Sequence, residues 1–199
     1  MAPSQEIYDE VLRVRADNKK IYASMGSLAA SGGYYIAVAA DQIFVDKASI
    51  VGSIGVLMNG FGFTGTMDKL GVERRLLTAG ENKGFLDPFS PLEADQQAHA
   101  SSMLGEIHNQ FIDAVKQGRG ERLKGSDVVF SGLMWTGEKS VELGLTDALG
   151  SVAYVAREVV QAEKIVNYSR RENLAERLVR RFGATLGDAL VQGLSPSLQ

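Results

Sequence analysis

The sequence contains no cysteine. This absence excludes disulfide bonds, thiolate metal sites and a cysteine nucleophile. No run of residues approaches the roughly 18 consecutive apolar residues that a membrane-spanning helix needs. The opening MAPSQEIYDE also lacks the basic and apolar regions of a secretory signal. We therefore expect the chain by itself to be soluble.

An excess of one charge is also absent, because 21 basic residues stand against 24 acidic ones. Such a balance provides no excess of basic residues for binding a nucleic acid, and we expect no nucleic-acid partner. Histidine is scarce, with only His99 and His108 in the chain. At about 100° per residue, nine positions apart in a predicted helix, the two face opposite sides. They cannot share a metal ion, and each is typical of a surface or edge-packing histidine; we predict no metal and no cofactor.

Helical and strand patterns alternate along the chain. Strands are predicted at 19–25, 42–46, 49–58 and 72–79, and helices in the first residues and at 33–40, 66–71, 91–117, 136–143, 151–162 and 171–192. The long helix has the clearest start, since Ser90-Pro91-Leu92-Glu93 resembles a capping box. This alternation predicts an α/β fold with a mainly parallel sheet flanked by helices, in a single domain over residues 1–199.

One serine stands among residues with almost no side chains, in LAASGGYYIA at 28–37. At a strand-to-helix turn, Ser31 would expose its hydroxyl while backbone N–H groups at the helix start face an oxyanion. Small neighbours would let a substrate backbone approach. The same cluster is also typical of a plain tight turn with close helix packing.

A nucleophilic serine needs a base. Neither histidine is suited to a triad by its placement, but a lysine whose pKa is lowered by burial can serve. Lysines are plentiful, so this chemistry alone does not select one.

The segment GSLAASGGYYIAVAADQIFVDKASIVGSIGV at 26–56 resembles the core motif of the signal peptide peptidase A family of serine proteases. The resemblance continues through 68–91, 111–120 and 135–150 and covers roughly residues 4–160. It implies the Clp protease/crotonase-like fold and a Ser-Lys dyad. The matching positions are Ser31 in AASGG and Lys83 in GENKG, and Ser53 in GSIGV corresponds to a serine that orients the lysine.

The resemblance further implies hydrolysis by acyl transfer, with the Gly32 N–H in the oxyanion hole and with Ala30 and Gly33 beside the substrate. Expected substrates are signal-peptide remnants or other hydrophobic peptides, cleaved at the periplasmic face of the bacterial inner membrane. Tyr34 and Tyr35 would either line a subsite or pack between helix and sheet.

The family also carries an anchoring segment and strands, with a second oxyanion donor, before the helix that begins this sequence. We therefore expect the domain to lack its N-terminal strands and membrane association to need a segment absent here. Members assemble into rings in which serine and lysine can come from neighbouring subunits, which implies a homo-oligomer. The apolar and basic faces of 170–199 suit core packing, assembly or a lipid surface.

Two other functions are compatible with these residues. The first is a non-catalytic oligomeric scaffold that keeps the same fold. The second is a crotonase-like acyl-CoA enzyme, which the serine and lysine motifs fit less well.

Overall fold

The structure is a computed structural model that describes residues 2–124, 126–162 and 164–169. Residues 1–161 form one compact unit and residues 162–199 another. The predicted helix at 171–192 lies outside the described residues. Among the described residues, no helix is both long and apolar enough to cross a bilayer.

Two three-stranded sheets form the centre of the larger unit. The first has the order β1-β3-β6, with β1 (Tyr22–Met25), β3 (Gln42–Val45) and β6 (Ala148–Leu149) all parallel. The second has the order β2-β4-β5, in which β2 (Leu28–Ala30) runs parallel to β4 (Ile50–Gly52) and β5 (Met134–Thr136) runs antiparallel to it. The predicted α/β class with mainly parallel pairing is confirmed.

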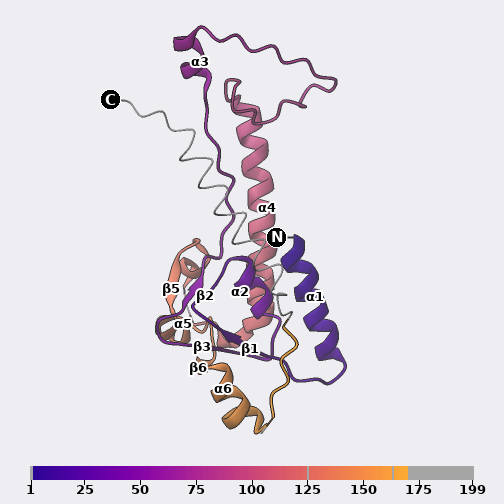
Figure 1. Ribbon diagram of the computed structural model, residues 1–199, viewed down its shortest axis with the longest axis vertical. Helices are drawn as coiled ribbons and strands as arrows, with labels where there is room; N and C mark the ends of the chain where they lie inside the picture. Colours follow the sequence, from indigo (N-terminus) through magenta and orange to yellow (C-terminus); the bar gives the residue numbers. More distant parts are fainter. Residues whose placement is uncertain (1, 125, 163, 170–199) are drawn as a thin grey trace, which may run out of the picture. The chain divides into compact units, whose positions relative to one another are not determined.

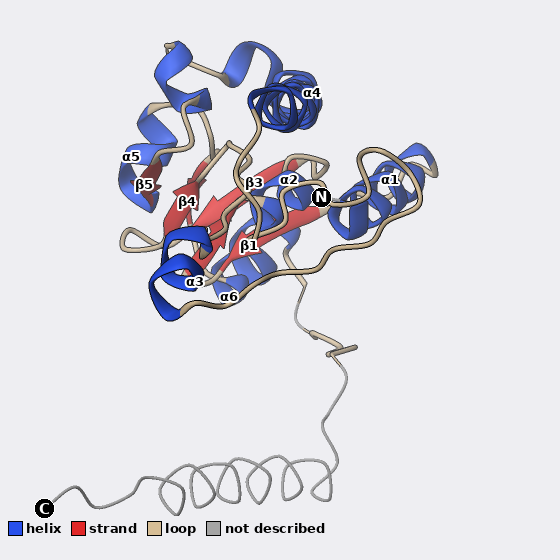
Figure 2. Ribbon diagram, turned by 90° about the horizontal axis from the view of Figure 1, so that it is seen from above, coloured by secondary structure: helices blue, strands red, loops and turns tan. Residues whose placement is uncertain are grey.

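Helices surround these strands (Figure 2). In chain order they are α1 (Ala2–Ala16), α2 (Gly32–Ala37), α3 (Thr64–Leu70), α4 (Ala94–Arg119), α5 (Gly137–Glu142) and α6 (Val152–Tyr154). Short 3₁₀ turns occupy Gly120–Arg122 and Asp127–Phe130, and a π-helical turn at Val155–Val160 continues α6.

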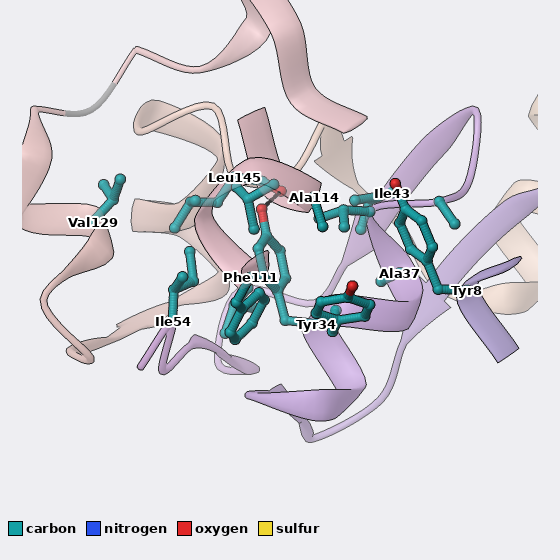
Figure 3. Packing of buried hydrophobic residues seen from close by; sticks show 14 of the residues in the cluster. Tyr8, Tyr34, Ala37, Ile43, Ile54, Phe111, Ala114, Val129 and Leu145 are labelled. Carbon is teal, nitrogen blue, oxygen red and sulfur yellow. Dashed lines mark hydrogen bonds between the residues drawn. The ribbon is translucent and has the colours of Figure 1, made fainter. Parts of the chain in front are cut away.

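The core lies where α2 meets the sheets and the C-terminal half of α4 (Figure 3). Tyr34, Phe111, Ile43, Ile54 and Leu145 are all fully buried there. Burying an aromatic or branched side chain stabilises a fold by about 1.5–3 kcal/mol, so this cluster anchors α4 on the sheets.

Residues 57–93 leave the core as an extension that we call the arm. Its own contacts hold it together, since the Phe63 N–H donates to the Pro88 carbonyl at 2.7 Å and the Phe63 and Phe89 rings stack at 5.4 Å. The arm rests on the N-terminal part of α4, where the Phe85 ring meets His99 edge-on at 5.6 Å. Figure 1 shows α3 in the part of the arm that lies beyond the sheets.

Several elements predicted from the sequence have different bounds in the structure. The predicted strand at 72–79 is wrong, because those residues lie in the arm outside any strand, and of 49–58 only Ile50–Gly52 is strand. The long helix begins at Ala94 rather than 91, since the Ser90 hydroxyl donates to Asp87 at 2.6 Å instead of capping a helix. By contrast, α3 ends as predicted at Gly71, which adopts φ 65.

Candidate active site

Ser31 lies at a strand-to-helix turn, as predicted. It follows β2 directly and precedes α2, with φ 51 and ψ −123. Its N–H donates to the Gly52 carbonyl at 2.8 Å, and its carbonyl accepts the Tyr35 N–H at 2.9 Å. A side-chain-bearing residue rarely adopts this conformation, which costs roughly 1–3 kcal/mol and persists where the surroundings enforce it. The turn therefore projects Ser31 away from the regular backbone on either side.

The residues beside Ser31 leave room around it. A Cβ on Gly33 would meet nothing within 4 Å, whereas one on Gly32 would lie 2.5 Å from the Ser4 hydroxyl oxygen of α1. Ala30 is the last residue of β2 and pairs with Gly52. The first turn of α1 thus lies against the residue that follows Ser31, and the approach over Gly33 stays open.

The two tyrosines after the turn belong to the core. The Tyr34 hydroxyl donates to the Leu145 carbonyl at 2.7 Å (Figure 3), and burial raises the pKa of this hydroxyl well above its usual value. The Tyr35 ring lies between those of Tyr8 and Phe111, with both centroid distances 5.2 Å. Of the two interpretations, packing in the core is confirmed, although Tyr35 packs between helices α1 and α4 rather than between helix and sheet.

Ser53 belongs to a second tight turn, directly after β4. It has φ 52, its N–H donates to the Leu133 carbonyl at 2.8 Å, and its carbonyl accepts the Gly55 N–H at 2.9 Å. Gly52, the residue before it, has φ 101 and fits closely against Trp135, because an added Cβ would lie 2.9 Å from that ring. Since Gly52 also binds Ser31, the structure brings the turns of Ser31 and Ser53 together.

Three contributors to this arrangement were not identified from the sequence. They are the Gly52 carbonyl, the Leu133 carbonyl and the His108 ring, whose Nε2 lies 3.0 Å from the Ile54 carbonyl oxygen. Backbone acceptors leave no mark on side-chain identity. The paired Gly52-Ser53 at the end of an apolar strand was the one available signal of a turn with positive φ.

Lys83 lies in the arm, in a run of turns that follows Gly80. Its side chain is exposed, and its neighbours Asn82 and Phe85 line a cavity of about 470 Å³ together with Asp95, His99 and Met103 of α4. Leu86 fixes this turn on α4 by donating its N–H to the Gln96 side-chain oxygen at 3.1 Å.

The positions on α4 separate this lysine from the serines within one chain. The Lys83 turn packs at the level of His99, whereas the Ser53 turn packs at the level of His108. Nine residues of helix at 1.5 Å per residue place these levels about 13.5 Å apart. The structure therefore groups Ser31, Gly32 and Ser53, and leaves Lys83 on the arm.

An ion pair stabilises the larger unit at the C-terminal end of α4. The buried Arg119 guanidinium donates to both carboxylate oxygens of Asp147 at 2.8 and 2.9 Å, and Asp147 also accepts the Ile43 N–H at 2.7 Å. Burial alone would raise the pKa of Asp147, but Arg119, the Ile43 N–H and Arg122 together lower it. This network joins α4 to β3 and β6 and supports the core.

Comparisons with known proteins identify relatives of this chain. It is 46% identical over 150 residues to a Na⁺/H⁺ antiporter NhaA of Brucella melitensis, covering 75% of this chain and 20% of that protein. It is 32% identical to a putative protease of Synechocystis, covering 74% of this chain and 53% of that protein. It is 29% identical to a putative signal peptide peptidase SppA of Enterococcus faecium, covering 74% and 43%. The chain thus spans between a fifth and about half of the length of these relatives.

The model of peptidase family S49 matches residues 13–166. The match includes Ser31, Ser53, Lys83 and all the strands described above. It bears out the predicted family, and the mainly parallel sheets with their flanking helices agree with the predicted α/β fold class. The chain belongs to peptidase family S49.

Proposed function

We propose that this chain hydrolyses peptides, with Ser31 as nucleophile and Lys83 as general base. The observation that carries the proposal is the strained backbone of Ser31, with φ 51 and ψ −123 at a strand-to-helix turn of a chain from a peptidase family. Strain of this kind is maintained at functional sites, where it aims a side chain.

The reaction is acyl transfer in two stages. The neutral amine of Lys83 takes the proton of the Ser31 hydroxyl as the oxygen bonds to the peptide carbonyl carbon. The Gly32 N–H donates to the oxyanion that forms, and Ser53 orients the lysine. The C–N bond then breaks, and the leaving amine takes the proton from Lys83. Water, deprotonated by the same lysine, releases the acyl group and restores Ser31. These steps require neither a metal nor a cofactor.

The substrates are proposed to be signal-peptide remnants or other hydrophobic peptides. The open space over Gly33 and the small side chain of Ala30 support binding of a peptide backbone beside Ser31. We propose that the whole protein acts at the periplasmic face of the bacterial inner membrane. The relative named as a signal peptide peptidase supports this substrate class.

The dyad is proposed to be completed between copies of the chain. Lys83 is exposed on the arm, and the arm carries large apolar side chains in water, with Leu77 94%, Leu57 80% and Phe61 76% exposed. Such a concentration of exposed apolar surface marks an interaction site. In a homo-oligomer, the arm of one copy would cover its neighbour and bring Lys83 into a dry environment beside that neighbour's Ser31.

Peptide cleavage tests the catalytic assignment. With a hydrophobic quenched-fluorescence peptide, Ser31→Ala and Lys83→Ala should each abolish turnover while circular dichroism shows a folded protein. Lys69→Ala, a change of an arm lysine without a proposed role, should retain it. Unchanged turnover in folded Ser31→Ala would refute the function.

Sedimentation tests the assembly separately. Leu77→Glu should shift the protein from oligomer to monomer and reduce turnover, because it places a charge in the proposed interface. Val152→Glu is the matched control, since Val152 is 59% exposed on α6 outside the arm. An unshifted oligomer in Leu77→Glu, or a monomeric unmodified protein, would contradict the assembly.

A second candidate is an oligomeric scaffold without catalysis. The exposure of Lys83 on the arm of the single chain favours it, because within one chain this lysine does not lie beside Ser31. Complete absence of reaction at Ser31 in a folded oligomer would support this alternative.

A further inference from the structure

The Ser53 turn is held from two sides. On one side, the Leu133 carbonyl accepts the Ser53 N–H at 2.8 Å, and Gly55 lies so close to Gly132 that an added Cβ would be 3.0 Å from its Cα. On the other side lies α4. The turn needs such support because Ser53 itself has φ 52, a conformation that disfavours residues with a Cβ.

The contact from α4 is made by one polar side chain. His108, half-buried on the helix, places Nε2 3.0 Å from the Ile54 carbonyl oxygen. A carbonyl only accepts, so the imidazole proton resides on Nε2 and donates to it. Ile54 is fully buried, so its main chain is fixed when this bond forms.

The same helix carries the turn of Lys83. Phe85 packs on His99 and Leu86 donates to Gln96, both on the N-terminal part of α4. His108 therefore joins the helix that bears the lysine turn to the turn that bears Ser53. A shift or rotation of α4 would break the His108 bond and release Ser53.

We propose that His108 is a positioning residue that holds Ser53 in the conformation required to orient the catalytic lysine, by donating from Nε2 to the Ile54 carbonyl. This inference rests on the proposed roles of Ser53 and Lys83. His108 touches neither substrate nor reacting atoms, and it acts through the backbone of the Ser53 turn.

The test is a double-mutant cycle on the full chain, measuring kcat/KM on the hydrophobic peptide. His108→Leu keeps an apolar contact but removes the donor, and should lower kcat/KM about tenfold, in line with the worth of one hydrogen bond. His108→Gln keeps a donor at the position of Nε2 and should restore the value to within about twofold. In a Ser53→Ala background, His108→Leu should have less than a twofold effect.

A purely structural role gives a different result. The inference would be overturned if His108→Leu lowered kcat/KM by the same factor in the unmodified chain and in the Ser53→Ala background. It would also be overturned if His108→Gln did not restore kcat/KM. His108→Asn provides a second variant if the leucine variant does not fold, because its shorter amide cannot reach Ile54 and the same tenfold loss is expected. Failure of the proposed function is distinguishable, since it would appear as turnover that persists in Ser31→Ala or Lys83→Ala.

Discussion

Replacing Ser31 with glycine should stabilise the fold relative to replacing it with alanine. Both substitutions remove the hydroxyl, so their difference isolates the backbone. At φ 51 and ψ −123 a residue with a Cβ costs about 2 kcal/mol. Glycine avoids this cost, but the greater conformational entropy of its unfolded chain lowers the free energy of unfolding by about 1 kcal/mol. The net expectation is a free energy of unfolding about 1 kcal/mol higher for Ser31→Gly than for Ser31→Ala.

Thermal unfolding by calorimetry measures this difference. For a chain of this size, 1 kcal/mol corresponds to a Tm about 2–4 °C higher. The control pair is Ser24→Gly and Ser24→Ala in β1, where the backbone is an ordinary strand and glycine should be the less stable by about 0.5–1 kcal/mol. A Ser31→Gly variant that melts at or below the temperature of Ser31→Ala would refute the claim that the turn is strained.

Two further predictions concern the supporting structure. Gly118→Ala should destabilise the fold by about 2 kcal/mol in urea unfolding, because its Cβ would lie 2.2 Å from the Val38 carbonyl oxygen. Gly105→Ala in the same helix, with nothing within 4 Å, should stabilise it by up to about 1 kcal/mol, and equal effects would contradict the packing of α4. The lowered pKa of Asp147 should make the free energy of unfolding fall as the pH drops below about 4, since the unfolded state binds the proton first. Asp147→Asn should show a shallower fall between pH 6 and 3, and an unchanged slope would contradict the ion pair's role.

The sequence was sufficient for the parts of the fold that local patterns determine. The strand-to-helix turn at Ser31 follows from small residues between an apolar strand and an apolar helix. The end of α3 follows from Gly71, whose φ of 65 suits a glycine at a helix end. The opposite facing of His99 and His108 follows from helical periodicity alone, and the structure places one against Phe85 and the other against Ile54.

The arm could not be predicted from such patterns. Residues 72–79 have the composition of a strand, but a strand also needs a neighbour with which to exchange backbone hydrogen bonds, and the arm offers none in the described chain. Similarly, the Ser90 hydroxyl donates to the Asp87 carboxylate instead of accepting an N–H at the start of a helix. The first error arose because strand pairing depends on tertiary contacts, and the second because a local turn at Asp87–Ser90 competes with the helix cap.

The candidate site was also predictable only in part from local patterns. Ser31, Gly32 and Ser53 come together because two adjacent parallel strands end side by side. Lys83 was selected by family resemblance, since its own surroundings in the sequence are those of an ordinary loop lysine. Its place in catalysis remains a prediction, because the groups that would desolvate it belong to a neighbouring copy in the proposed assembly.

Reaction with a fluorophosphonate, followed by mass spectrometry of the labelled peptide, tests the Ser31 and Lys83 pairing most directly. We predict a single adduct on Ser31 in the unmodified oligomer, formed at a rate that falls at least a hundredfold in Lys83→Ala and is unchanged in Lys69→Ala. An adduct on another residue, or labelling of Ser31 that proceeds equally fast in Lys83→Ala, would contradict it.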